Sequence, residues 1–286
     1  MTPTARRLPG AQGLELNALE WSREGIALVF LHGFGNDAHV WDESAPLVAP
    51  HYRTLALDLR GHGDSDCDPE GRYDHATMAE DVETALAALG IERLVLVGHS
   101  MGGRVAMHVS GRNPEKLAGL VIVDSGPDLD TRGTTRIRME TESAELAFDS
   151  VEEYARLLVE LYPAAKPATM AALARHWTRQ REDGRFEPKL DPAFRRWRAP
   201  DASPDQLRAH MKAESELLWK ALEATPCPTL VVRGAASDVL SPDTADRMVD
   251  DVLAQGQLAV IPRASHSVML DNPEEWNDAL CGFVLG

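Results

Sequence analysis

The residues that could do chemistry are gathered around one serine. Ser100 is the centre of the sequence GHSMGG at residues 98–103, which directly follows the apolar run Leu94–Val97. A buried strand that enters Gly-x-Ser-x-Gly and continues into a helix-forming segment is typical of a nucleophile elbow, a strained turn that exposes the serine hydroxyl. The flanking glycines leave room for the turn and for close packing of the following helix. We therefore predict that Ser100 is a nucleophile.

A serine nucleophile needs two further side chains. One is a base that takes its proton, and the other is an acid that orients the base. In the chain order Ser, Asp, His, both partners follow the nucleophile on loops after later strands. His266 follows the apolar run Leu258–Ile261, and Asp238 follows the run Thr229–Val232. We expect His266 to be the base and Asp238 the acid.

The negative charge of a tetrahedral intermediate must also be stabilised by preorganised N–H donors. The backbone N–H of Met101, the residue after the nucleophile, is one expected donor. The other is the N–H of Phe34, in the sequence HGFG at residues 32–35 behind the apolar run Ile26–Leu31. The glycines of this segment allow the backbone to approach a substrate closely. His32 and His99 flank these donors, and we expect both to have structural roles.

Apolar runs of the β type alternate with amphipathic stretches along most of the chain, which is typical of a mostly parallel sheet with helices on both faces. The rhythm breaks between about residues 127 and 225, where the pattern predicts helices at Ser150–Leu161, Pro167–Arg181 and Ser203–Leu222. A helical insertion in such a fold is expected to cover the carboxyl edge of the sheet, where open α/β folds bind ligands. An antiparallel edge hairpin is expected around Gly13–Trp21.

Composition limits the classes of partner and indicates the cellular compartment. The 286 residues carry 45 acidic and 29 basic side chains, a formal net charge of −16, which argues against nucleic acid as a partner. No apolar run approaches the ~18 residues of a membrane span, and no signal peptide is visible. The three cysteines are far apart and fit reduced thiols, so we expect a cytoplasmic protein. No metal-ligand spacing is present, and we predict no metal.

The chain resembles the α/β-hydrolase superfamily, as a serine esterase-like member with a helical cap. The resemblance rests on the HGFG segment, the sequence DLRGHGDS at residues 58–65, the elbow, the sequence PTLVVRG at residues 228–234, and Ser265-His266 with the sequence DNPE at residues 271–274. It implies a mostly parallel eight-stranded sheet with the cap inserted after the sixth strand. The implied core is residues 1–126 and 226–286, and the implied cap is residues 127–225.

The resemblance also leaves choices open. The superfamily sometimes places its acid after the preceding strand, so Asp124, at the end of the run Leu120–Val123, is the alternative to Asp238. In the segment 58–65, Arg60 and Asp64 are expected to make local hydrogen bonds. Several cap side chains could line an acyl or alcohol pocket, although for each one taken singly a place in the core of the cap is favoured. These side chains are Trp177, Trp197, His210 and Trp219.

Serine at the elbow limits the set of reactions that the resemblance implies. Relatives that dehalogenate or open epoxides place an aspartate there, whereas serine favours attack on a carbonyl to give an acyl-enzyme. We predict a carboxylesterase that acts without a cofactor on a small ester-like molecule, with no membrane insertion and possible assembly as a homodimer. A C–C bond hydrolase or a lactonase with the same residues is the alternative. A cofactor-free haloperoxidase or perhydrolase and a non-enzymatic receptor are more remote.

Overall fold

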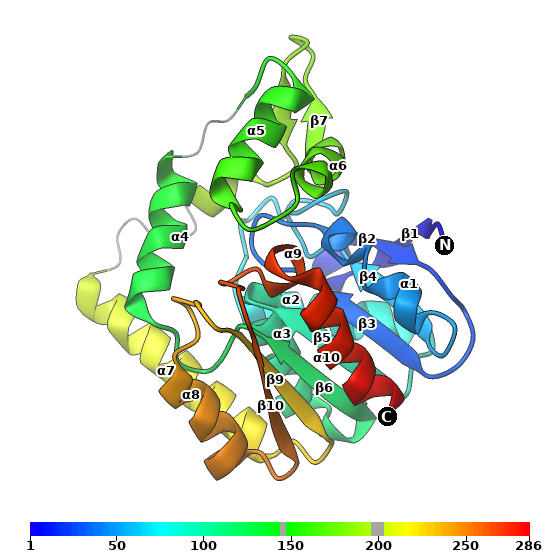
Figure 1. Cartoon of the computed structure of the whole chain (residues 1–286), viewed down its shortest axis with the longest axis vertical. Coiled ribbons are helices and arrows are strands. Elements are labelled where there is room, and N and C mark those ends of the chain that lie inside the picture. Colours follow the sequence, from blue (N-terminus) through cyan, green and yellow to red (C-terminus); the bar gives the residue numbers. More distant parts are fainter. Residues whose placement is uncertain (144–146, 196–202) are drawn as a thin grey trace.

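A computed structural model describes residues 1–143, 147–195 and 203–286 and shows one twisted eight-stranded sheet (Figure 1). Its strand order is β1-β2-β4-β3-β5-β6-β9-β10, in which the strands from β4 to β10 run parallel and β1 and β2 form an antiparallel edge. The mostly parallel eight-stranded fold expected from the sequence is confirmed. The strands of this sheet are β1 (Thr4–Pro9), β2 (Glu15–Glu20), β3 (Ala27–Leu31), β4 (Arg53–Leu57), β5 (Leu94–His99), β6 (Leu117–Val123), β9 (Thr229–Gly234) and β10 (Gly256–Ile261).

Helices cover both faces of the sheet, as Figure 1 shows, because its central strands are apolar on both sides. One apolar cluster joins the sheet to α2 (His75–Ala88), α3 (Met101–Arg112), α7 (Pro204–Glu223), α8 (Pro242–Asp246) and the π-helical turn η5 (Arg247–Val252). The other joins it to η2 (Ala38–Trp41), α1 (Ala45–Val48), α9 (Val268–Asp271) and α10 (Pro273–Leu285). Short 3₁₀ turns complete the core at η1 (Ala11–Gly13) and η3 (Pro114–Lys116).

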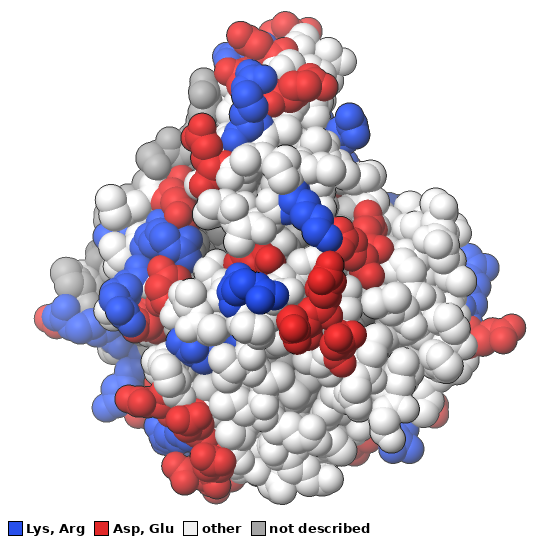
Figure 2. All heavy atoms as spheres, viewed as in Figure 1, with Lys and Arg blue, Asp and Glu red and all other residues white. Residues whose placement is uncertain are grey.

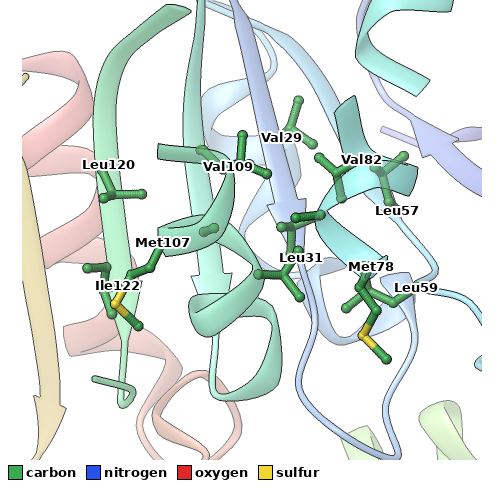
Figure 3. Packing of buried hydrophobic residues seen from close by; sticks show 14 of the residues in the cluster. Val29, Leu31, Leu57, Leu59, Met78, Val82, Met107, Val109, Leu120 and Ile122 are labelled. Atoms are coloured by element: carbon green, nitrogen blue, oxygen red, sulfur yellow. The ribbon is translucent and has the colours of Figure 1, made fainter. Parts of the chain in front are cut away.

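The packing between α2, α3 and the sheet fixes the position of the elbow. Figure 3 shows aliphatic side chains of the sheet meeting methionine and valine side chains of the two helices in one layer. Each labelled residue is less than a tenth exposed, so the layer is closed to water. A helix held so firmly gives the turn before it a fixed position. The labelled residues are Val29, Leu31, Leu57, Leu59, Met78, Val82, Met107, Val109, Leu120 and Ile122.

The segment between β6 and β9 is helical, with one small hairpin. It contains α4 (Thr131–Ser143), α5 (Val151–Leu161), α6 (Pro167–Trp177), the hairpin strands β7 (Thr178–Gln180) and β8 (Phe186–Pro188), the turn η4 (Pro192–Arg195), and α7. Helices α5 and α6 stand beyond the end of the sheet (Figure 1). Helix α7 instead packs on α3, and its Leu218 and Leu222 are buried in the core cluster. The predicted cap of residues 127–225 therefore includes a helix that covers the sheet.

Charged side chains of both signs are interspersed on the face that Figure 2 shows, including the surface of the helical segment. Within the described ranges, no helix combines the length and the apolar character that a membrane crossing requires.

Candidate active site

The elbow turn is strained and closely packed. Ser100 has φ 52° and ψ −115°, a conformation that costs energy for a residue with a side chain. Its N–H donates to the carbonyl of Val123 at 2.9 Å, and its carbonyl accepts from Ser125 Oγ at 2.8 Å. A Cβ on Gly102 would lie 2.5 Å from the Leu31 carbonyl, so only glycine fits there. The surroundings therefore hold Ser100 in a geometry that it would not adopt alone.

His266 contacts the serine hydroxyl directly. Its Nε2 lies 2.8 Å from Ser100 Oγ, and its Nδ1 lies 2.8 Å from Asp124 Oδ2. The residue sits in the loop between β10 and α9, and its carbonyl accepts a hydrogen bond from His99 Nε2 at 2.9 Å. The imidazole is thus held on both sides, and a neutral ring with its proton on Nδ1 can accept the hydroxyl proton on Nε2.

Asp124 occupies the position of the orienting acid. It is the first residue after β6, has φ 46°, and is completely buried. Its Oδ1 accepts from the Gly234 N–H at 2.9 Å, and its Oδ2 accepts from Ser237 Oγ at 2.6 Å as well as facing His266. These donors hold the carboxylate in one orientation. A buried carboxylate with such partners is suited to orienting an imidazole.

The expectation that Asp238 holds the imidazole is wrong. Its carboxylate makes a two-pronged ion pair with Arg136 of α4, at 2.8 and 2.9 Å. That hydrogen bond and charge lower the pKa of Asp238, and its side chain remains one-third exposed. The loop after β9 runs on for several residues before it reaches this position, so Ser237 turns inward to Asp124 and Asp238 turns outward. Asp124 reaches His266 without an intervening loop, because it is the first residue after its strand.

The segment that should supply the second oxyanion donor lies against the elbow. The Gly102 N–H donates to the His32 carbonyl at 3.1 Å, and the ring of Phe34 packs on that of Phe194 with centroids 5.3 Å apart. Met101 is the first residue of α3, where backbone N–H groups have no partner within the helix. The roles of Phe34 and Met101 as oxyanion donors remain predictions.

Gly33 is the point of closest approach between this segment and the site. A Cβ there would lie 2.6 Å from His99 Nδ1 and 3.3 Å from Ser100 Cβ. The His99 ring cannot move freely, since it is buried and bonded to the His266 carbonyl. We expect Gly33→Ala to lower kcat/KM about 10²-fold, as a displacement of ~1 Å in a reacting group does. The control is Gly282→Ala in α10, where the added methyl meets nothing within 4 Å. Equal activity of the two variants would contradict the close-approach argument.

The two flanking histidines have structural partners. His32 Nδ1 donates to the Gly33 carbonyl at 2.8 Å, and its Nε2 accepts from the Leu59 N–H at 2.9 Å, so the ring is neutral. Burial lowers the pKa of His32 and lowers that of His99 well below its ordinary value. Both rings therefore brace loops around the site, in line with the roles expected from the sequence.

The three predicted pocket residues that the structure describes are dispersed. Trp177 is buried at the end of α6 and donates from Nε1 to Asp37 Oδ1 at 2.9 Å, beside the HGFG segment. Trp219 instead lies under the Arg247 guanidinium, 3.9 Å from its ring centroid, in a surface groove between α7 and η5. His210 is exposed on α7. A pocket role for these last two is not supported, and Trp197 lies outside the described residues.

Other residues near the HGFG segment were not predicted from the sequence. Asp37 is buried, and burial together with the charge of Asp58 raises its pKa to about 7. Asn36 Nδ2 donates to the Tyr162 hydroxyl at 3.4 Å, which links this segment to the end of α5. The short distance of Asn36 and Asp37 from Phe34 along the chain was the only available signal.

The fold and the site together define a class of protein: a parallel sheet whose central strand ends in a strained serine turn, with histidine and aspartate supplied by later loops. The chain belongs to the α/β-hydrolase family, whose model, described as "alpha/beta hydrolase fold", matches residues 26–273. The resemblance seen in the sequence is therefore confirmed.

Relatives with hydrolase names span nearly the whole chain. It is 26% identical to the 2-(acetamidomethylene)succinate hydrolase of Mesorhizobium japonicum, over 91% of this chain and 88% of that protein. It is 29% identical to the mouse sn-1-specific diacylglycerol lipase ABHD11, over 95% and 85%. A crystal structure of an α/β hydrolase from Novosphingobium aromaticivorans superposes with a TM-score of 0.82 and 28% identity, over 99% and 98% of the two chains.

Proposed function

We propose that this α/β hydrolase is a serine hydrolase that forms an acyl-enzyme on Ser100, with carboxylic esters as its substrates. The observation that carries the proposal is the continuous line from Ser100 Oγ to His266 Nε2 and from His266 Nδ1 to Asp124 Oδ2, each step 2.8 Å long. These distances suit proton transfer between the groups. Among the relatives, the name of the mouse diacylglycerol lipase supports an ester as the substrate.

The proposed reaction has two halves. His266 removes the hydroxyl proton as Ser100 Oγ attacks the ester carbonyl, and the backbone N–H groups of Phe34 and Met101 receive the developing negative charge. The imidazolium is stabilised by Asp124 and then donates its proton to the leaving alcohol. His266 then removes a proton from water as the water oxygen attacks the acyl carbonyl, and the imidazolium returns that proton to Ser100 Oγ as the acyl–oxygen bond breaks and the acid leaves. No step calls for a metal or an organic cofactor.

The proposal is tested with p-nitrophenyl esters of increasing acyl length and with a fluorophosphonate probe. We expect the wild-type chain to hydrolyse short esters and to be labelled once, at Ser100. The variant Ser100→Ala should do neither while it keeps the thermal stability of the wild type. Hydrolysis that survives in Ser100→Ala, or a folded wild type that resists the probe, would contradict the proposal.

The same three residues could cleave a C–C bond or open a lactone, because each reaction begins with attack on a carbonyl. Panels of dienoic acids and lactones, run beside the esters, separate these alternatives by their kcat/KM. The ester proposal predicts that the highest kcat/KM belongs to an ester. A higher value on either of the other panels would replace the substrate class and leave the nucleophile unchanged.

A further inference from the structure

Two histidines and an aspartate lie close together at the interface between the core and the helical segment. His39 belongs to η2, Asp42 follows that turn, and His176 lies in the last turn of α6. Their potential ligand atoms all lie within 4.8 Å of one another. The two imidazoles are stacked, with centroids 3.5 Å apart and planes at 18°, and His39 Nδ1 lies 2.9 Å from Asp42 Oδ2. Because His176 comes from a distant part of the chain, no spacing in the sequence could reveal this cluster.

Hydrophobic packing does not account for this arrangement. Both rings are partly exposed and the Asp42 side chain is 41% exposed, so the cluster opens to solvent on one side. Two protonated imidazoles would repel each other at this distance. A cation beside the stacked rings, bound by one nitrogen of each ring and by the carboxylate, would use all three groups as ligands.

The donor atoms of the three side chains favour one class of cation over another. Two imidazole nitrogens and one carboxylate oxygen are ligands that Zn²⁺ and its transition-metal neighbours prefer, whereas Mg²⁺ and Ca²⁺ prefer sites made of oxygen. Two ligand atoms of one tetrahedral Zn²⁺ are about 3.3 Å apart. Binding one ion would therefore draw the ligand atoms closer through rotations of the His39 and His176 side chains, and the open side would leave a fourth position for water. We propose that His39, Asp42 and His176 form a Zn²⁺-type binding site that joins α6 to η2.

A metal bound here would strengthen the contact between α6 and the segment around η2 and would take no part in the reaction. Trp177, next to His176, already bonds Asp37, and Thr169 of α6 donates to Glu43 at 3.2 Å. The metal would add ligand bonds to the same contact, close to the HGFG segment. Since the three ligands come together only in the folded chain, binding should stabilise the folded state increasingly as the free Zn²⁺ concentration rises above Kd.

The test uses the full chain without an affinity tag, stripped of metal by a chelator and then titrated with ZnCl₂ in a calorimeter. We expect one Zn²⁺ to bind per chain, with a Tm that rises with Zn²⁺ concentration, and no response to Mg²⁺ or Ca²⁺. His176→Gln and Asp42→Asn should each weaken Zn²⁺ binding at least tenfold and abolish the rise in Tm. His51→Gln, at an exposed histidine outside the cluster, should behave as the wild type.

Several results would overturn the site. They are the absence of saturable Zn²⁺ binding to the wild type, equal binding by the cluster variants and by His51→Gln, or a rise in Tm that survives in both cluster variants. The metal-free Tm of each variant shows that it folds. If His176→Gln failed this check, Asp42→Asn, with its exposed side chain, would still decide. Neither readout depends on hydrolysis, so the outcome is independent of the proposed esterase function.

Discussion

Replacing Asp124 by asparagine is expected to lower kcat/KM for an ester substrate about 10⁴-fold, with little change in KM. The Gly234 N–H requires an acceptor at the Oδ1 position, so the asparagine carbonyl should remain there and its NH₂ group should face His266 Nδ1. An NH₂ group can only donate to Nδ1, which forces the imidazole proton onto Nε2. The ring could then no longer accept the proton of Ser100. Steady-state hydrolysis of a p-nitrophenyl ester measures the effect.

The matched control is Asp238→Asn, the same substitution at the acid that follows the next strand. Asp238 pairs with Arg136 and is partly exposed, and such pairs contribute little to stability. We expect a change of less than about tenfold in kcat/KM, because the effect is confined to the contact between α4 and the loop after β9. A large loss in Asp238→Asn together with a mild one in Asp124→Asn would return the role of acid to Asp238.

Replacing Arg60 by methionine is expected to lower the free energy of unfolding by about 3–5 kcal/mol, the typical effect of removing one partner of a buried ion pair. The Arg60 side chain is fully buried and donates to Asp68 at 2.9 Å, to Asp81 at 2.8 Å and to Gln12 at 2.8 Å. Methionine keeps much of the aliphatic volume but leaves two carboxylates in the interior without this cation. Urea unfolding should show a lower midpoint with an unchanged m-value.

The control for that variant is Arg72→Met, which removes another arginine from the same carboxylate. Arg72 Nε donates to Asp68 at 2.7 Å, but its side chain is 37% exposed. Water can therefore replace much of what the substitution removes, and the urea midpoint should shift far less than in Arg60→Met. Equal shifts would show that the buried position of Arg60 has no special importance for stability.

The central sheet could be predicted from the sequence because its signals are local. The run Leu94–Val97 is apolar throughout, as a strand covered on both faces must be, and it lies within β5. The helix expected at Pro167–Arg181 was only partly correct. The helix ends at Trp177, and the chain then enters the hairpin of β7 and β8, whose pairing depends on contacts outside the segment. Helix α4 was not predicted, because its sequence is largely polar and offers few apolar residues to mark a buried face.

The role of Arg60 illustrates the limit of local reasoning. The sequence predicted local hydrogen bonds for it, yet two of its partners, Gln12 and Asp81, lie far away along the chain. The hydrogen-bond partners of a buried guanidinium are set by which acceptors the tertiary fold places around it. Similarly, His39 and His176 stack only because α6 packs against η2. Neither arrangement leaves a trace in sequence spacing.

The central strands, the serine elbow and the histidine that faces it could all be predicted locally, because each depends on an apolar run or on a short motif at its end. The choice between the two carboxylates required the folded structure. Asp124 and Asp238 follow neighbouring strands, β6 and β9, and both fit the chain order around His266. The choice between them depends on the path of the loop after β9, which turns Ser237 inward and Asp238 outward to Arg136. That path is determined by packing against α4, and no local pattern encodes it.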